Sequence, residues 1–272
     1  MKTILFIGSR GFIGRKLKRK LKNKFKLICL NRKNGFNISR PNNFEKLIDK
    51  KIDIILNLSG QVSKKNSEMK KTIIDGNKNI IKFAKEKKNI IVYFFSTSLV
   101  YGYSKKTLNE KSKTLPSSIY AKMKRAAEIQ YLNSNINFKI LRIASVYDEN
   151  KGGIVKNIIN GISQKKKIII TNENVYRNYI HVDDLIKIMI KILEKKLKKK
   201  IYNIGNENIM IKKIIYQIEK TFNKKIIYFN KKISLKKLSS QKIYSHFLLN
   251  EIKYTPRVNL ISFIKKKLKN EF

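Results

Sequence analysis

A tyrosine and a lysine four positions apart, Tyr120 and Lys124, form a spacing with a direct chemical meaning. Residues four apart lie on the same face of a helix, and the pattern over Ile119–Leu132 predicts a helix. An ammonium group beside a phenol favours the phenolate, so we expect Lys124 to lower the pKa of Tyr120. Tyr120 can then take a proton from a hydroxyl or give one to a ketone near neutral pH. Because the chain has 13 tyrosines and 63 lysines and arginines, this spacing needs support from its surroundings.

Three glycines, Gly8, Gly11 and Gly14, lie between a predicted first strand and a predicted first helix. Glycines at this place allow a tight turn and let the backbone approach a pyrophosphate, which the N-terminus of the helix attracts. The alternative is an ordinary turn in which the glycines only relieve steric crowding. We predict a dinucleotide-binding turn, formed by Gly8, Arg10, Gly11, Phe12, Ile13 and Gly14.

The end of the second predicted strand, Lys26–Leu30, bears on which dinucleotide binds. Enzymes that use NAD place an Asp or Glu there to bind the ribose 2′-hydroxyl. Here Asn31 and Arg32 follow the strand, and a guanidinium can pair with a 2′-phosphate. We therefore expect NADP(H) to be favoured, with NAD(H) as the alternative. Besides Asn31 and Arg32, we assign Leu58, Ser59 and Gly60, at the end of the third predicted strand, to the cofactor site.

Strands and helices alternate through the first half of the chain, and the apolar segments are continuous, as in strands covered on both faces. This alternation predicts an α/β fold with a Rossmann-type, doubly wound parallel sheet. We expect residues 1–150 to form an NAD(P)-binding domain and residues 151–272 a small α/β substrate lobe, packed on the first and partly interleaved with it. The predicted strands are Thr3–Ile7, Lys26–Leu30, Ile52–Leu58, Ile90–Ser96 and Lys139–Ile143, and the predicted helices are Ile13–Lys22, Asn43–Ile48, Thr72–Glu86 and Ile119–Leu132.

Several segments together resemble the extended short-chain dehydrogenase/reductase family, which includes nucleotide-sugar epimerases, 4,6-dehydratases and 4-ketoreductases. The glycine turn has the spacing Gly-x-x-Gly-x-x-Gly, and Tyr-x-x-x-Lys follows later in the chain. Because the matches occur in the family's order over nearly the whole chain, they are more specific together than any one alone. The other matching segments are Ser96–Gly102, Leu141–Tyr147, Arg177–Asp184, Tyr202–Gly205 and Tyr254–Pro256.

The resemblance implies roles for individual residues. Counting back from Val100-Tyr101-Gly102 places Thr97 at the family's catalytic Ser/Thr, where a hydroxyl stabilises charge on the reacting oxygen; the alternative is a strand-end hydroxyl that only satisfies a turn. Lys124 would also bind the nicotinamide ribose, and Arg177 would approach the substrate's pyrophosphate. We therefore assign catalysis to Thr97, Tyr120 and Lys124, and substrate binding to Thr97, Ser98, Tyr147 and Arg177, with no metal.

The implied activity is hydride transfer at a sugar carbon of a nucleotide diphosphate sugar, by an NAD(P)-dependent epimerase or 4-ketoreductase. Leu99 stands where the family's dehydratases carry a carboxylate, which argues against elimination of water. Ile73 stands where an Asn is common in the family. Asp183 is expected to cap the helix that follows it, so we do not assign a catalytic role to His181.

The chain carries a formal net charge of +45, which raises a rival class, a nucleic-acid-binding protein on the same fold. The lysines are spread along the whole chain, as expected from compositional drift and solvated surface, so we expect no specific nucleic-acid partner. The single cysteine and the short apolar segments predict a cytoplasmic protein without membrane insertion. A homodimer is left open.

Overall fold

The computed structural model describes the whole chain except residues 61–62, 64, 88, 150–152, 165, 167, 171, 224, 227, 231–239 and 270–272. The chain forms two compact units, and neither is a single stretch of sequence. The first unit comprises Met1–Val100, Ser118–Arg142 and Ile192–Tyr202, and the second comprises Tyr101–Ser117, Ile143–Lys191 and Asn203–Phe272. No helix in the described part of the chain is long and apolar enough to span a membrane.

A six-stranded sheet with the order β10-β6-β4-β3-β1-β2 confirms the predicted fold class. The pairs β1–β2, β1–β3 and β3–β4 are parallel. The chain places β2 on one side of β1 and then adds β3, β4, β6 and β10 on the other side, as in a doubly wound sheet. The strands are β1 (Thr3–Ile7), β2 (Lys26–Leu30), β3 (Ile54–Asn57), β4 (Ile91–Thr97), β6 (Asn137–Ile143) and β10 (Ile201–Ile204).

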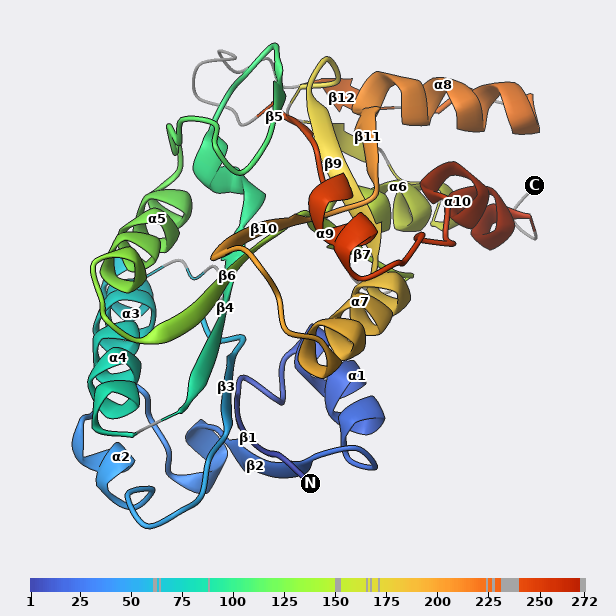
Figure 1. Ribbon diagram of the computed structural model, residues 1–272. Helices are drawn as coiled ribbons and strands as arrows, with labels where there is room; N and C mark the ends of the chain where they lie inside the picture. Colours follow the sequence, from blue (N-terminus) through green and yellow to red (C-terminus); the bar gives the residue numbers. More distant parts are fainter. Residues whose placement is uncertain are drawn as a thin grey trace. The chain divides into compact units, whose positions relative to one another are not determined.

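Helices cover the two faces of this sheet in the first unit. Figure 1 shows α3, α4 and α5 on one side of the sheet and α1 on the other. The predicted helix Thr72–Glu86 is interrupted, because its first turn is a π-helix over Lys71–Asp75. The α-helices are α1 (Phe12–Leu21), α2 (Asn42–Glu45), α3 (Asn66–Lys70), α4 (Gly76–Glu86) and α5 (Ile119–Leu132), with 3-10 turns at Arg32–Asn34 and Ser98–Tyr101.

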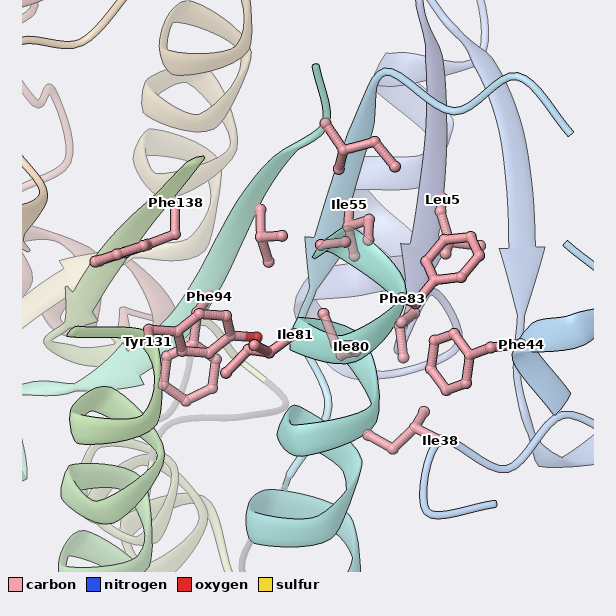
Figure 2. Packing of buried hydrophobic residues seen from close by; sticks show 14 of the residues in the cluster. Leu5, Ile38, Phe44, Ile55, Ile80, Ile81, Phe83, Phe94, Tyr131 and Phe138 are labelled. Atoms are coloured by element: carbon pink, nitrogen blue, oxygen red, sulfur yellow. The ribbon is translucent and has the colours of Figure 1, made fainter. Parts of the chain in front are cut away.

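The core on the α4–α5 side explains why these elements pack where they do. Side chains of α4 pack against β1 and β3, and Tyr131 of α5 lies on Phe94 of β4 with ring centroids 5.0 Å apart (Figure 2). Successive strand residues point to opposite faces, so Leu5 belongs to this cluster while Ile4 and Phe6 are buried on the other face. Both faces of β1 are therefore buried from solvent, as its continuous apolar sequence predicts.

The second unit has a three-stranded sheet with the order β11-β9-β7 and two small strand pairs, β12–β8 and β13–β5. The helix α7 begins at Val182, and the Nδ1 atom of His181 accepts a hydrogen bond from the Asp183 N–H at 3.3 Å. The expectation that Asp183 is the N-cap is therefore wrong, because the helix begins one residue before Asp183, which lies in its first turn. The strands are β5 (Thr107–Leu108), β7 (Ser145–Tyr147), β8 (Ile168–Ile170), β9 (Tyr176–His181), β11 (Glu207–Met210), β12 (Tyr228–Asn230) and β13 (Lys242–Ile243), and the helices are α6 (Ile154–Ser163), α7 (Val182–Glu194), α8 (Ile211–Phe222), α9 (His246–Glu251) and α10 (Leu260–Leu268).

Candidate active site

The glycine turn joins β1 to α1 with the backbone folded tightly on itself. The Gly11 N–H donates to the Gly8 carbonyl at 3.1 Å, and Gly11 is the N-cap of α1 without a side-chain capping bond. A Cβ atom on Gly14 would lie 2.2 Å from the Gly8 carbonyl oxygen, so no larger residue fits this turn. The first turn of α1 contains no acidic residue, which leaves the positive end of its dipole available to an anion.

A pocket with a volume of about 400 Å³ opens beside this turn, entirely within the first unit. It is lined by eight of the residues assigned to the cofactor: Gly8, Arg10, Gly11, Asn31, Arg32, Leu58, Ser59 and Gly60. The sequence did not predict the contribution of Ser63, Glu68, Met69 and Thr72, which line the pocket from α3, the π-helix and the segment before them. These residues become neighbours of the glycine turn only because β3 lies beside β1 in the sheet.

The residues after β2 form a small capped turn at the edge of this pocket. The Asn31 side chain accepts a hydrogen bond from the Lys33 N–H at 3.0 Å, and the Asn34 side chain accepts one from the Asn31 N–H at 2.8 Å. The side chain of Arg32 donates from Nη2 to the hydroxyl of Thr72 at 3.1 Å. This arrangement places a guanidinium on the pocket wall and ties it to the π-helix.

Lys124 lies in the interior of the first unit, one helical turn after Tyr120. Its ammonium group donates to the carbonyl oxygens of Phe95 at 2.8 Å and Ser59 at 3.1 Å, and its side chain is almost fully buried. Burial lowers the pKa of Lys124 to about 7, and the charge of Glu128 opposes that shift. Lys124 therefore joins α5, the end of β4 and the pocket loop Leu58–Gly60.

Tyr120 is half-buried near the start of α5, and its ring centroid lies 5.9 Å from the Lys124 ammonium. Burial raises the pKa of the Tyr120 phenol to about 12. This direction is opposite to the one expected from a neighbouring lysine, because Lys124 directs its ammonium to two backbone carbonyls and burial penalises the phenolate. At neutral pH the phenol therefore carries its proton.

Thr97 is the last residue of β4, and Ser98 begins the short 3-10 turn that follows; both side chains are buried. The Thr97 hydroxyl oxygen accepts a hydrogen bond from the Leu99 N–H at 3.2 Å, as a strand-end hydroxyl that satisfies a turn does. This bond does not use the hydroxyl proton of Thr97. The geometry therefore fits both a catalytic hydroxyl and a strand-end hydroxyl that only satisfies the turn. Its catalytic role stays a prediction.

A buried ion pair on α5, one helical turn after Lys124, was missed in the sequence. The carboxylate of Glu128 accepts hydrogen bonds from Arg142 on β6 and from the hydroxyl of Ser96, at 2.6 Å in the second case. Glu128 follows Lys124 by one helical turn, so Tyr120, Lys124 and Glu128 share one face of α5. That four-residue spacing is the signal that could have identified Glu128.

The residues assigned to substrate binding in the second unit have different environments. Tyr147 is 1% exposed and packs against Tyr179 and Phe263 in the core of that unit. This buried position does not support the predicted contact between Tyr147 and substrate, which stays a prediction. Arg177 on β9 is partly exposed, and its guanidinium donates to the Tyr176 carbonyl at 3.3 Å. Within the described residues, no cluster of three or more His, Cys, Asp or Glu side chains is arranged to bind a metal ion.

Comparison with known proteins bears on this geometry. A family model described as the NAD dependent epimerase/dehydratase family matches residues 4–205, which include the glycine turn, Thr97, Tyr120, Lys124 and Arg177. The chain belongs to this family. Its membership in the NAD dependent epimerase/dehydratase family confirms the resemblance predicted from the sequence.

Two curated proteins are similar in sequence to this chain. It is 32% identical over 148 residues to a dTDP-4-dehydro-6-deoxyglucose reductase of Escherichia coli, covering 50% of this chain and 47% of that protein. It is 30% identical over 156 residues to an ADP-L-glycero-D-manno-heptose-6-epimerase of Brachyspira hyodysenteriae, covering 52% and 48%. The chain thus matches about half the length of these curated relatives.

Solved structures in the epimerase/dehydratase family have the same fold over nearly the whole chain. A UDP-glucose 4-epimerase of Thermotoga maritima solved with UDP-glucose has a TM-score of 0.83 at 20% identity, covering 98% of this chain and 97% of that one. A dTDP-glucose 4,6-dehydratase of Bacillus anthracis solved with NAD has a TM-score of 0.81 at 19% identity, covering 99% and 96%. None of these four proteins is named for nucleic-acid binding, so they lend that alternative no support.

Proposed function

We propose that this chain is an NAD(P)-dependent enzyme that transfers hydride at a sugar carbon of a nucleotide diphosphate sugar. The observation that carries the proposal is that Lys124 joins the dinucleotide pocket to the predicted catalytic residues: its ammonium donates to Ser59 of the pocket loop and lies beside Tyr120. The named activities of the two relatives, reduction of a keto sugar nucleotide and epimerisation of a sugar nucleotide, agree with this chemistry.

The residues fit a dinucleotide. The glycine turn admits close approach to the backbone, the N-terminus of α1 attracts a pyrophosphate, and Arg10 and Arg32 line the pocket. A bound nicotinamide would supply or accept the hydride. The chain's own task is to bind and orient the sugar and to move one proton at the oxygen of the reacting carbon.

Tyr120 is the group that moves this proton. Because the pKa of its phenol is about 12, Tyr120 is a proton donor at neutral pH, and it can give its Oη proton to a ketone oxygen as the carbon gains a hydride. The hydroxyl of Thr97 would donate to the same oxygen and stabilise the charge that develops on it. The same Thr97, Tyr120 and Lys124 would serve a 4-ketoreductase or an epimerase, because an epimerase also returns a hydride and a proton to a ketone, so both activities belong to the proposal.

The proposal also includes a preference between the two dinucleotides, NADP(H) and NAD(H). Arg32 is tied to the pocket wall by Thr72, and no carboxylate follows β2 to bind a 2′-hydroxyl. We infer that NADP(H) binds more tightly than NAD(H), since a guanidinium pairs with a 2′-phosphate.

The test is a cofactor-coupled assay with purified protein. Reduction is followed by the loss of NADPH absorbance with 4-keto nucleotide sugars, and epimerisation by chromatography of nucleotide sugars with no net change in cofactor. The Tyr120→Phe variant is the matched control, since it differs by one oxygen atom. Dinucleotide binding without turnover on any nucleotide sugar would contradict the substrate class, and absence of dinucleotide binding would contradict the proposal as a whole.

A further inference from the structure

A buried side chain of α4, Asn77, lies at the centre of a polar network that neither the sequence motifs nor the proposed mechanism uses. Its Oδ1 atom accepts hydrogen bonds from Asn57 Nδ2 at 2.9 Å and from the Tyr131 hydroxyl at 2.6 Å, and its Nδ2 atom donates to the Ile73 carbonyl at 2.6 Å. Figure 2 shows Tyr131 of α5 reaching toward α4. Asn57, Asn77 and Tyr131 are all at most 1% exposed, so these bonds form away from water.

The first branch of this network leads to the pocket loop Leu58–Gly60. The Oδ1 atom of Asn57 accepts from the Ser59 N–H at 3.0 Å and from the Ser59 hydroxyl at 2.6 Å. The carbonyl of the same serine accepts from the Lys124 ammonium. Asn57 can offer its oxygen to Ser59 in this orientation because Asn77 accepts from its amide nitrogen.

The second branch leads to the π-helix Lys71–Asp75, which packs against the same loop through Ile73. Asn77 donates to the Ile73 carbonyl within this π-helix, and Thr72 beside it contacts Arg32. Ile73 also packs closely on the loop, since a Cβ atom on Gly60 would lie 2.7 Å from Ile73 Cγ1 and 3.2 Å from Lys124 Nζ. The loop therefore has almost no free space between Ile73 and Lys124.

We propose that Asn77 is a positioning residue for the dinucleotide pocket: its one amide sets the loop Leu58–Gly60 through Asn57 and the π-helix through the Ile73 carbonyl. A π-turn inserted into a helix is a common feature of functional sites, and here the inserted turn presents Thr72 to the pocket and packs Ile73 against Gly60 of the pocket loop. This inference rests on the proposed function, because the pocket is taken to bind a nicotinamide dinucleotide. It assigns a role to a residue that touches neither cofactor nor substrate.

The test compares two substitutions in the same network. Asn77→Leu keeps the branching at Cγ and has a higher helix propensity than Asn, but it removes both branches. Tyr131→Phe removes the hydroxyl that bonds to Asn77 and keeps the Asn77 bonds to Asn57 and to the Ile73 carbonyl, so it is the matched control for loss of a buried hydrogen bond. For each protein the dissociation constants of NADH and of ADP are measured by titration calorimetry, together with the melting temperature.

We expect Asn77→Leu to weaken NADH binding by about tenfold, the effect of one well-made hydrogen bond on a binding constant. Binding of ADP should change by less than about twofold, because the glycine turn belongs to β1 and α1 and makes none of these bonds. Tyr131→Phe should lower the melting temperature and leave both dissociation constants within about twofold of wild type. A merely structural role would not separate NADH from ADP.

Equal NADH affinity in wild type and Asn77→Leu would overturn the inference, as would parallel weakening of NADH and ADP or an equal effect of Tyr131→Phe. If Asn77→Leu does not fold, Asn57→Ala breaks the loop branch alone, and the same separation of NADH from ADP is expected. Wild-type protein that binds neither NADH nor NADPH would overturn the proposed function itself, an outcome distinct from wild-type binding that Asn77→Leu leaves unchanged.

Discussion

The guanidinium of Arg142 donates two hydrogen bonds to the carboxylate of Glu128, from Nε at 3.0 Å and from Nη2 at 2.7 Å. Both side chains are buried, and Glu128 is also paired with the partly exposed Arg125 at 3.0 Å, so Arg142 is its buried cationic partner. Glu128 also accepts from Ser96, the residue before Thr97, while Lys124 donates to Phe95, the residue before Ser96. The end of β4 is thus bonded to α5 at two successive residues.

Loss of one partner of this pair should strongly destabilise the protein. We expect Arg142→Met to lower the free energy of unfolding by about 3–5 kcal/mol, because it leaves the Glu128 carboxylate buried with a weaker set of partners. The double variant Glu128→Leu/Arg142→Met should lose less than the sum of the two single variants. Urea unfolding of the four proteins measures this coupling, and additive losses would show that the two charges do not depend on each other.

The buried ammonium of Lys124 should make stability depend on pH. Its pKa is lowered from 10.5 to about 7, so between these values the unfolded chain binds more protons at this side chain than the folded chain does. The contribution of Lys124 to the free energy of unfolding should therefore rise with pH, by up to about 1.4 kcal/mol per pH unit. Below pH 7 the penalty for burying the charge is complete, and above the unfolded pKa it disappears.

The matched variant for this prediction is Lys124→Met, which cannot titrate at this position. The difference in unfolding free energy between wild type and Lys124→Met should move in favour of wild type between pH 7 and pH 10. Denaturant unfolding at several pH values measures it, and titrating groups that do not interact with Lys124 cancel in the comparison. Parallel pH dependence of the two proteins would show that Lys124 keeps its ordinary pKa in the fold.

Tyr120→Phe removes the transferable proton and keeps the ring. We expect turnover on the nucleotide sugar to fall by about 10²–10⁴-fold, the usual contribution of a general acid. The dinucleotide dissociation constant should stay nearly unchanged, since Lys124 and the pocket loop are untouched. Steady-state kinetics and cofactor titration measure the two effects, and near-wild-type turnover would remove Tyr120 from the proton-transfer role.

Arg32 should control the choice between the two dinucleotides. We expect wild type to bind NADPH roughly tenfold to a hundredfold more tightly than NADH, the range of a charged hydrogen bond. Arg32→Ala should abolish most of this ratio by weakening NADPH alone, and Thr72→Val should reduce it partly, because it frees the guanidinium while keeping the side-chain shape. Tighter binding of NADH by wild type would mean that Arg32 does not contact the 2′-phosphate.

The protein should not eliminate water from a nucleotide hexose. Leu99 follows Ser98 in the 3-10 turn after β4, and its side chain cannot transfer a proton. We expect incubation with nucleotide hexoses and dinucleotide to produce no 4-keto-6-deoxy sugar nucleotide, measured by mass spectrometry. Accumulation of that product would show that another residue supplies the acid and base for elimination.

Local sequence determined the elements that make the site possible. The strands Thr3–Ile7 and Lys26–Leu30 and the helix Ile119–Leu132 were predicted with the bounds that the structure has, because continuous apolar segments and helical periodicity are properties of neighbouring residues. The glycine turn, the spacing of Tyr120 and Lys124, and the family followed from the same short-range patterns, since a motif is a set of residue types at fixed separations.

Tertiary structure alone decided the environments of these residues. The pKa of Tyr120 moves upward because burial outweighs a lysine that bonds to the carbonyls of Ser59 and Phe95, and neither carbonyl can be assigned to Lys124 from spacing. The π-turn is stabilised at Ile73 by Asn77, whose orientation depends on a strand 20 residues earlier and a helix 54 residues later. Periodicity records which face a residue lies on, whereas a hydrogen bond between buried groups also depends on which distant segment the fold brings within about 3 Å.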